Sequence, residues 1–285
     1  CQKQGNLFMA KTLLITAASG TVGTLLVDRL LAAGHSVKAA SRTGKTGVSG
    51  RVKFDFADPS TFEEAIAGVD AAYVVIPTGT MDFESLTTFI DLAAAKGVKL
   101  VLQTAIGVDA SDEIPYRQLE LRVEKSGTGY VLLRPNWFFD NFHTFWLQGI
   151  RTHDLIALPA GDARTTFIDA RDIADAAAAA LVGDQFDGQA ITLTGADSLS
   201  YQEAADVISR LRNRAVRYEA VDTEGFTAYA QTTGLSATHA QFLAQVFYPV
   251  AQGWVSADTG EVARVTGRPP RRFVDYFSDY ADRFR

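Results

Sequence analysis

Apolar positions along the chain fall into two patterns, short continuous runs and longer runs at helical spacing. Leu13, Leu14 and Ile15 form a fully apolar run, which is typical of a strand buried on both faces of a parallel sheet. Apolar residues then recur at helical spacing over 25–31, after a turn of small residues at 16–23. The stretch therefore predicts a strand, a tight turn and a helix.

The same alternation continues downstream and sets the predicted fold. Further strands are predicted at 36–41, 52–56, 72–76, 99–104 and 130–134, with helices at 60–67 and 82–96 between some of them. Alternating strands and helices indicate an α/β fold, a doubly wound parallel sheet of the Rossmann type. Beyond Gly149 the alternation becomes less regular, although a strand at 189–194 and an amphipathic helix at 201–211 are still predicted.

These patterns predict the domain organisation. We expect a dinucleotide-binding Rossmann domain over 9–150 and a smaller α/β portion on the substrate side over 151–285, partly interleaved with the first. The first eight residues have neither a folding pattern nor the apolar core of a signal peptide. We interpret 1–8 as a leader and expect the native chain to start at Met9.

Composition and charge narrow the possible partners. The chain has 285 residues, of which 47% are hydrophobic and 21% charged, as in ordinary globular proteins. A formal net charge of −6 argues against a nucleic-acid or membrane partner, and no apolar run reaches the roughly 18 residues of a membrane span. Cys1, the single cysteine, lies in the leader, so neither disulfides nor thiol catalysis are expected. We expect a cytoplasmic protein, a monomer or homodimer, without a metal.

The turn at 16–23 is the candidate binding site for a dinucleotide. Gly20 would let the backbone approach a pyrophosphate, and Gly23 would let the helix pack closely on the strand. The helix N-terminus adds free N–H groups and the positive end of the helix dipole. The alternative is an ordinary strand-to-helix turn with two glycines.

Arg42 sits at the tip of the second predicted strand, where NAD-binding units carry an acidic residue that grips the ribose 2′-hydroxyl. No acid stands here, and a guanidinium binds a 2′-phosphate with forked geometry. NADP(H) is therefore the predicted cofactor, with a solvated surface arginine as the alternative. Carboxyl ends of parallel strands line the ligand crevice, so Ile76, Pro77 and Thr78 should face the nicotinamide half of the cofactor.

The turn sequence T-A-A-S-G-T-V-G resembles the T-G-A-S/T-G-x-x-G turn of the NmrA-like atypical short-chain dehydrogenases. That group includes type 2 quinone oxidoreductases and triphenylmethane reductase. Ala17 stands where the family has its first glycine, which is harmless if φ there is negative. The resemblance implies two sets of cofactor contacts, Ala17, Ser19, Gly20, Thr21, Val22 and Gly23 in the turn, and Asp55 and Phe56 at the adenine.

The helix after the fifth strand distinguishes this chain from ordinary short-chain dehydrogenases. Those enzymes carry Tyr-x-x-x-Lys there, whereas this sequence reads DEIPYRQLELRVEKSG and has no such pair. Alignment with the family places Tyr116 where a lysine or histidine is usual. Tyr116 or Thr104 is then at most a weak proton donor, and both, with Ala105, are expected beside the cofactor. A plain residue in the first helical turn is the alternative for Tyr116.

The segment P-N-W-F-F-D-N at 135–141 resembles the family's L-R-x-x-x-F/Y-x-E/D-N stretch, which passes beside the nicotinamide. Asn136 and Trp137 are the predicted substrate-side residues, and Pro135, Asn136 and Phe139 the predicted cofactor contacts. Further aromatic residues up to Trp146 are more typical of a core than of a binding site. His143 is more typical of a satisfied histidine than of an acid catalyst.

Two functions remain open. The first is an NADPH-dependent reductase for a small, conjugated molecule such as a quinone, dye or enone. The second is a sensor that binds the dinucleotide and signals to a protein partner. An apolar pocket favours the reductase, whereas exposed apolar surface without a pocket favours the sensor.

Overall fold

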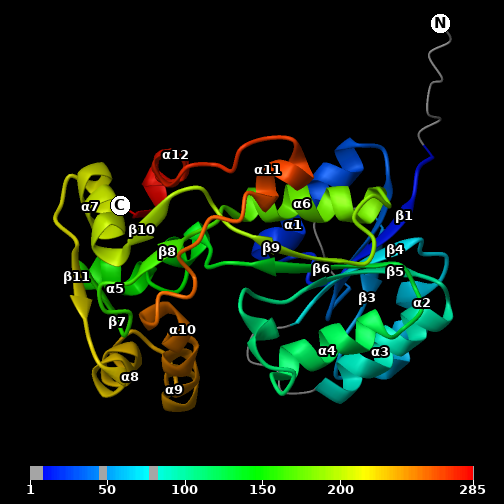
Figure 1. Cartoon of the computed structure of the whole chain (residues 1–285), viewed down its shortest axis with the longest axis horizontal. Helices are drawn as coiled ribbons and strands as arrows, with labels where there is room; N and C mark the ends of the chain where they lie inside the picture. Colours follow the sequence, from blue (N-terminus) through cyan, green and yellow to red (C-terminus); the bar gives the residue numbers. More distant parts are fainter. Residues whose placement is uncertain (1–8, 45–49, 77–82, 285) are drawn as a thin grey trace, which may run out of the picture. The chain divides into compact units, whose positions relative to one another are not determined.

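The computed structural model describes residues 9–44, 50–76 and 83–284 (Figure 1). The predicted cofactor contacts Pro77 and Thr78 lie outside the described residues. The chain divides into two compact units, each assembled from three segments. Unit 1 comprises Cys1–Gln103, Pro115–Leu132 and Ala177–Ala190, and unit 2 comprises Thr104–Ile114, Leu133–Ala176 and Ile191–Arg285.

The main sheet has seven strands in the order β3-β2-β1-β4-β5-β6-β9. It is parallel, as the pairings of β1 with β2 and β4, of β2 with β3 and of β4 with β5 show. Its strands are β1 (Thr12–Ile15), β2 (Ser36–Ser41), β3 (Arg51–Lys53), β4 (Ala71–Val75), β5 (Lys99–Gln103), β6 (Tyr130–Pro135) and β9 (Gln189–Leu193). The strands β2 and β3 extend the sheet on one side of β1, and β4 and the later strands extend it on the other side. This reversal of direction confirms the predicted doubly wound fold.

Helices join these strands. In unit 1, α1 lies on one face of the sheet and α2, α3 and α4 lie on the other (Figure 1). The helices and short 3₁₀ turns that join the strands are α1 (Thr21–Ala32), η1 (Pro59–Thr61), α2 (Phe62–Ile66), α3 (Phe83–Ala95), η2 (Val108–Ala110), α4 (Pro115–Glu124) and α6 (Ala170–Val182). The two units share α6.

The predicted boundaries hold to within one or two residues for most strands, and β3 is the exception. It ends at Lys53 instead of Phe56. Phe54 and Phe56 instead turn into a cluster with Phe62 and Phe89, with ring centroids 4.7 to 6.3 Å apart. Burial of these rings removes their apolar surface from water and stabilises the cluster.

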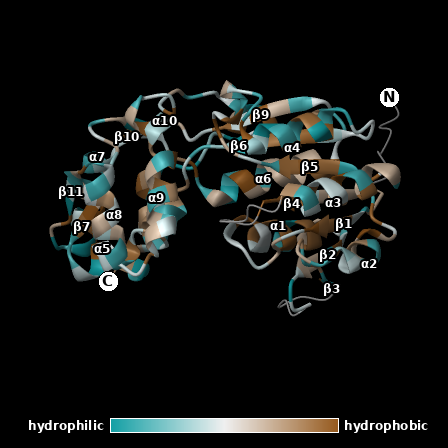
Figure 2. Cartoon of the chain, turned by 90° about the horizontal axis from the view of Figure 1, so that it is seen from below, coloured by the Kyte–Doolittle hydropathy of each residue, from teal (hydrophilic) through white to brown (hydrophobic). Residues whose placement is uncertain are grey.

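The core of unit 1 is aliphatic apart from this phenylalanine cluster. Leu14, Val74 and Leu102 come from neighbouring strands, and Leu86 and Ile90 come from α3. The central strands are strongly hydrophobic in Figure 2, as expected for a sheet covered on both faces.

Unit 2 contains the remaining elements, two small sheets and a set of short helices. The sheets pair β10 with β8 and β11 with β7. The bounds are η3 (Phe139–His143), α5 (Leu147–Thr152), β7 (Leu155–Leu158), β8 (Arg164–Thr166), β10 (Ser198–Ser200), α7 (Tyr201–Arg212), β11 (Arg217–Ala220), α8 (Thr223–Thr232), α9 (Ala237–Val246), α10 (Tyr248–Ala251), α11 (Glu261–Thr266), α12 (Phe273–Asp279) and η4 (Ala281–Phe284).

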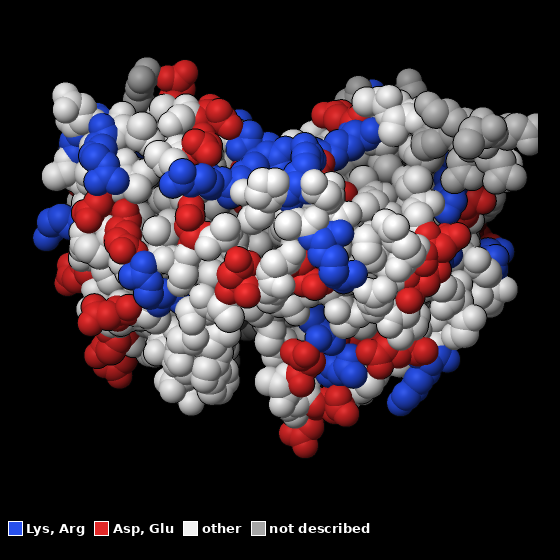
Figure 3. All heavy atoms as spheres, turned by 45° about the horizontal axis from the view of Figure 1, so that its top comes forward, with Lys and Arg blue, Asp and Glu red and all other residues white. Residues whose placement is uncertain are grey.

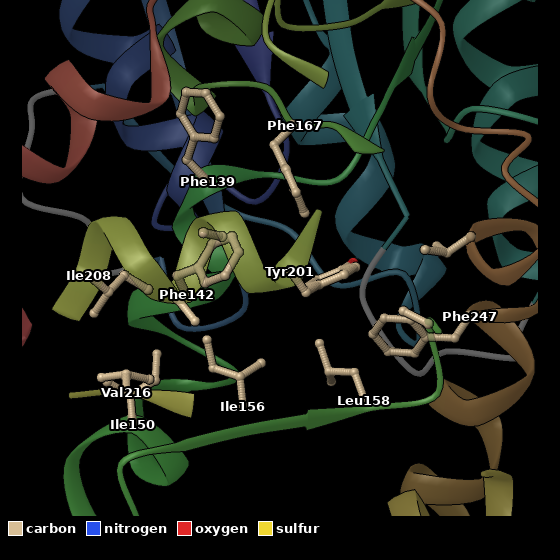
Figure 4. Close-up of a cluster of buried hydrophobic side chains, with 14 of the residues drawn as sticks. Phe139, Phe142, Ile150, Ile156, Leu158, Phe167, Tyr201, Ile208, Val216 and Phe247 are labelled. Atoms are coloured by element: carbon tan, nitrogen blue, oxygen red, sulfur yellow. The ribbon is translucent and has the colours of Figure 1, made fainter. Parts of the chain in front are cut away.

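Aromatic rings dominate the core of unit 2. Ile156 and Leu158 point from β7 toward Phe142 and Tyr201, and Phe247 lies nearby (Figure 4). The Tyr201 ring is fully buried between segments that precede and follow it in sequence. This core therefore depends on long-range contacts between aromatic side chains.

The surface carries both signs of charge. Basic and acidic side chains are mixed over the face in Figure 3. Among the helices of the described residues, none is long and apolar enough to cross a membrane.

Candidate functional site

The turn between β1 and α1 is wound tightly around the carbonyl of Ala17. The Gly20 N–H donates to that carbonyl oxygen at 2.8 Å. A Cβ added to Gly23 would lie 2.2 Å from the same oxygen and 3.0 Å from the Ala18 Cα. Only glycine at position 23 lets α1 start this close to the strand, as the sequence predicted.

Ala17 itself adopts a left-handed conformation with φ of +49°. Alanine was expected to be harmless here only if φ were negative, and that condition is not met. A non-glycine residue in this region costs on the order of 1 kcal/mol because its Cβ crowds the following carbonyl oxygen. The chain therefore carries backbone strain at this position, which a glycine would relieve.

The N-terminus of α1 is open toward an anion. Gly20 is its N-cap, in an extended conformation, with no side-chain hydrogen bond to the cap, and the first turn has no acidic residue. Ser19, Gly20 and Thr21 are exposed, whereas Val22 and Gly23 are buried. The exposed turn, the uncapped N–H groups and the positive end of the helix dipole fit a dinucleotide pyrophosphate.

Arg42 follows β2 and is exposed. Within the described part of the chain, no ion pair joins its guanidinium to a carboxylate. The side chain is thus available for a phosphate, and the predicted 2′-phosphate contact stays a prediction.

The residues predicted near the adenine and nicotinamide have other partners in unit 1. The Asp55 carboxylate accepts a hydrogen bond from the Ala57 N–H at 3.1 Å, which closes a local turn. Phe56 and Ile76 are buried in the core of unit 1. Asp55 is half-buried, and the contacts predicted for Asp55 and Phe56 stay predictions.

Tyr116 lies in the first turn of α4, half-buried against Phe83, with ring centroids 5.9 Å apart. Burial raises the pKa of its hydroxyl above the ordinary value. A higher pKa makes the phenol a weaker acid, so Tyr116 could donate a proton only to a strongly basic oxygen. The environment of Tyr116 agrees with the weak donor that the sequence predicted.

Thr104 and Ala105 begin unit 2, directly after β5. The Thr104 N–H donates to the Leu133 carbonyl oxygen at 2.9 Å, and the Ile106 N–H donates to that of Pro135 at 3.0 Å. Thr104 and Pro135 are buried, and Ala105 is half-buried. These bonds hold the end of β5 against the end of β6.

Asn136 is buried, and its amide is fully engaged. Its Nδ2 donates to the Thr166 carbonyl and hydroxyl oxygens and to the Val255 carbonyl oxygen, at 2.8 to 3.1 Å, and its Oδ1 accepts from the Trp137 N–H at 2.8 Å. The side chain thus ties three distant segments together. The predicted hydrogen bond to an acceptor molecule would require one of these bonds to break.

Trp137 lines an apolar pocket within unit 2, with a cavity volume of about 60 Å³. The pocket lies between the loop after β6, strand β7 and helices α8 and α9. Its lining consists of Trp137, Phe145, Trp146, Gly149, Leu155, Ile156, Ala157, Leu158, Phe226, Tyr229, Ala230, Thr233, Leu235, Leu243 and Phe247. Trp137 thus faces a cavity, as its predicted substrate-side role requires.

Phe139 is buried in the aromatic core, 5.1 Å from Phe273 and 5.2 Å from Tyr276 between ring centroids. Its side chain has almost no exposed surface, which argues against the predicted contact of the ring with the cofactor. Phe142, from the same aromatic segment, is also buried in the core of unit 2, as expected. His143 is a satisfied histidine, because its Nδ1 lies 2.5 Å from the Tyr276 hydroxyl.

A buried acid next to this histidine was not identified from the sequence. Burial, followed by repulsion from Asp169, raises the pKa of Asp140 to about 6. Burial, followed by the nearby Arg283, lowers the pKa of His143 to about 4. Asp140 Oδ2 accepts from the Ala170 N–H at 3.3 Å, at the start of α6. The two pKa values are thus shifted in opposite directions, and neither group lines the pocket.

Sequence reasoning also missed most of the pocket lining. Leu155 to Leu158 form a short strand in a region without clear alternation, and Ala230 and Leu243 resemble ordinary helix-face residues. Gly149 was a usable signal. A Cβ there would lie 2.1 Å from the Tyr229 hydroxyl, so a glycine inside an aromatic segment marked the close approach of another helix.

The chain matches known proteins over most of its length. The sequence profile of the NmrA-like family matches residues 9–256. The chain is 31% identical to (4-alkanoyl-5-oxo-2,5-dihydrofuran-3-yl)methyl phosphate reductase of Streptomyces griseus, over 95% of this chain and 99% of the relative. It is 30% identical to the oxidoreductase YesF of Bacillus subtilis (94% and 95%) and 28% identical to the NAD(P)H azoreductase of Xenophilus azovorans (95% and 99%).

Solved structures share the fold at lower identity. The NADPH complex of the quinone oxidoreductase QOR2 from Escherichia coli has a TM-score of 0.77 at 20% identity, over 94% of this chain and 99% of that one. The NADP complex of NmrA, a negative transcriptional regulator, has a TM-score of 0.70 at 17% identity, over 94% of both. The family match and the full-length relatives agree with the turn after β1. The chain is therefore an oxidoreductase that belongs to the NmrA-like family.

Proposed function

We propose that this protein is an NADPH-dependent reductase that transfers hydride to a conjugated acceptor such as a quinone, dye or enone. The observation that carries the proposal is the turn after β1, where Gly23 allows a close approach and the N-terminus of α1 stays open. Relatives named as reductases and an NAD(P)H azoreductase support it. When bound, the cofactor supplies a hydride, and the residues of the chain bind, orient and exclude water.

The cofactor would be held by unit 1. The N–H groups at the start of α1 would bind the pyrophosphate, and Arg42 would bind the 2′-phosphate. Both groups are exposed and follow the neighbouring strands β1 and β2 along the chain, within the same unit. The guanidinium of Arg42 favours NADPH over NADH, because it can bind the 2′-phosphate. An acidic residue, which would repel that phosphate, is absent from this position in the sequence.

The protein would contribute little acid catalysis. The sequence has no Tyr-x-x-x-Lys pair, and burial raises the pKa of Tyr116. A simple ketone would need a proton at the alkoxide oxygen, so ketones should be poor substrates. Acceptors that spread the incoming charge need little help, so proximity to the cofactor in an apolar site accounts for most of the catalysis.

The experiment that tests the activity follows NADPH oxidation against a panel of quinones, azo and triarylmethane dyes, enones and simple ketones. Turnover should be seen with conjugated acceptors and be weak or absent with ketones. Turnover of ketones alone would contradict the mechanism. No turnover with any acceptor, while NADP(H) still binds tightly, would favour the sensor.

The sensor is the second candidate, and one observation favours it. Phe242, Val246, Tyr248 and Trp254 are exposed apolar side chains close together in sequence within unit 2. Apolar side chains of this size in one stretch are typical of an interaction surface. The pocket lined by Trp137 favours the reductase, because a sensor needs no apolar cavity for a small molecule.

Arg42→Ala tests the cofactor assignment by binding alone. The affinity for NADPH should fall about 10- to 100-fold, which corresponds to the loss of one charge-assisted contact of ~1.5–3 kcal/mol, with NADH affinity little changed. Arg210→Ala is the matched control, because Arg210 is an exposed arginine on α7 of unit 2. An unchanged ratio of NADPH to NADH affinity in Arg42→Ala would refute the assignment.

A further inference from the structure

The apolar pocket of unit 2 is too small for a ring. Its cavity volume is about 60 Å³. An apolar cavity of about 150 Å³ holds one benzene molecule, so each carbon atom needs about 25 Å³. The pocket therefore has room for about two or three carbon atoms, which is enough for a short aliphatic group.

Small residues create this room among larger ones. Gly149 on α5, Ala157 on β7 and Ala230 on α8 have the smallest side chains of the lining. All three are buried. A Cβ added to Gly149 would lie 2.1 Å from the Tyr229 hydroxyl oxygen, so this position allows no larger residue without a shift of α8. The size of the pocket thus depends on small residues from three elements.

The lining carries no charged side chain. In the part of the chain that the structure describes, no Asp, Glu, Lys, Arg or His lines the pocket. Its two hydroxyl groups are engaged, because that of Tyr229 donates to the Leu155 carbonyl oxygen at 3.1 Å and that of Thr233 to the Ala230 carbonyl oxygen at 2.9 Å. A polar group would enter without a hydroxyl partner, whereas an aliphatic group would gain apolar burial and dispersion contacts.

The pocket reaches the surface of unit 2. Phe145 lines it and is 48% exposed, and Trp137, Leu235 and Leu243 of the lining are half-buried. An aliphatic group can therefore enter the pocket while the molecule that carries it stays outside.

We propose that this pocket is a subsite for a short aliphatic substituent of about two or three carbon atoms, carried by a larger molecule whose ring or polar part stays outside. The inference rests on the proposed function, because the molecule that carries the substituent would be the acceptor of the reductase. It adds a preference for substituent length, which the proposed function leaves open.

Acceptors that differ only in chain length test the subsite. The probes are para-benzoquinones with a single methyl, ethyl, propyl or hexyl group, and kcat/KM is measured with saturating NADPH. It should rise about fourfold for each carbon atom added from methyl to propyl, which corresponds to ~0.8 kcal/mol per CH₂. The hexyl compound should fall below the propyl compound, because its chain exceeds the cavity. A continuous rise to hexyl, or equal values throughout, would overturn the inference.

Filling the cavity locates the preference. Ala230 is buried and lines the pocket, whereas Ala228 on the same helix is exposed. Ala230→Val should remove the preference for propyl over methyl, and Ala228→Val should keep it. Because the comparison is made between two acceptors of one variant, a general loss of activity cancels. Leu243→Phe on α9 is a second filling variant in case Ala230→Val fails to fold. An unchanged preference in a folded filling variant would overturn the inference.

Xenon tests the cavity without the reaction, because it binds in apolar cavities of proteins and its NMR shift reports binding. The shift caused by the unaltered protein should largely disappear with Ala230→Val and persist with Ala228→Val. The same shift with all three proteins would overturn the inference.

The two proposals fail in different ways. Turnover of quinones without a length preference would overturn the subsite and leave the reductase intact. No turnover of any acceptor, with a xenon shift that Ala230→Val removes, would contradict the reductase and support the pocket as an apolar subsite.

Discussion

The core of unit 1 is built mostly from strands and helices that are close to one another along the chain, whereas the core of unit 2 joins segments far apart in sequence. In unit 1 the strand pairs β1·β2 and β4·β5 form from consecutive elements. In unit 2 the Asn136 side chain bonds the Val255 carbonyl oxygen across 119 residues, and the Tyr276 hydroxyl lies 2.5 Å from His143 across 133 residues.

The two units therefore offer a bound molecule different features. Unit 1 presents backbone N–H groups at a helix terminus, and these depend on turn geometry more than on side-chain identity. Unit 2 presents a cavity whose shape depends on the packing of aromatic rings such as Trp137 and Phe247. Substitutions in unit 1 should therefore act on cofactor affinity, and those in unit 2 on acceptor choice and stability.

The largest expected effect is that of Gly23→Ala in unit 1. Its Cβ would lie 2.2 Å from the Ala17 carbonyl oxygen, so the turn must move. We expect dinucleotide affinity, measured by titration, to fall at least about 100-fold, or ~2.7 kcal/mol. Gly34→Ala is the control, because φ there is +84° and nothing lies within 4 Å of an added Cβ. It should cost about 1 kcal/mol of stability and leave cofactor affinity unchanged. Similar affinity losses in both variants would mean that the turn is not the binding site.

Two buried groups of unit 2, Asp140 and His143, should make opposite contributions to the pH dependence of stability, so that each hides the other. Asp140 has its pKa raised to about 6, so its burial destabilises the fold above that pH and less so as pH falls toward 4. His143 has its pKa lowered to about 4, so it destabilises the fold as pH falls from about 6.5 to 4. The two contributions have opposite signs and similar size, on the order of 3 kcal/mol each.

Single substitutions should expose each contribution, relative to the unaltered protein, in denaturant unfolding between about pH 4 and 6.5. His143→Gln should become relatively more stable as pH falls, because only Asp140 still changes its charge there. Asp140→Asn should become relatively less stable over the same range. The double variant should restore the pH dependence of the unaltered protein. The same slope in both single variants would contradict the assignment.

A smaller effect is expected for Tyr116→Phe. On the proposed mechanism the phenol gives a proton late or only braces the cofactor, so turnover of a quinone should fall less than about tenfold, or ~1.4 kcal/mol. Steady-state rates with saturating NADPH measure this. A loss of about three orders of magnitude with intact cofactor affinity would make Tyr116 an essential acid.

The smallest effect is a gain in stability. Ala17→Gly removes the strain of an alanine at φ of +49°. We expect about 1 kcal/mol of stabilisation, which corresponds to a rise of ~2–4 °C in Tm, measured calorimetrically. A fall in Tm would mean that the turn gains more from the methyl group than it loses to strain.

Much of unit 1 could be predicted from the sequence. The strands, α1 and the role of Gly23 all follow from apolar runs, helical spacing and small residues within about 20 positions of one another. Phe56 shows the limit of this reasoning. Its sequence pattern predicted that β3 continues to Phe56, but β3 ends at Lys53. The Phe56 ring packs instead against three other phenylalanines.

The sequence by itself was enough to predict the family, the doubly wound fold and the turn after β1, because each is indicated by residue patterns within short stretches of the chain. Only the tertiary structure decided the left-handed Ala17, the engaged amide of Asn136 and the uncharged lining of the pocket. The hydrogen bond across 119 residues and the closure of α8 and α9 over β7 depend on which distant segments meet. The φ of Ala17 was not predictable because alanine ordinarily avoids the left-handed region. Local spacing fixes the period of an element, whereas the partners of its side chains depend on how the whole chain packs.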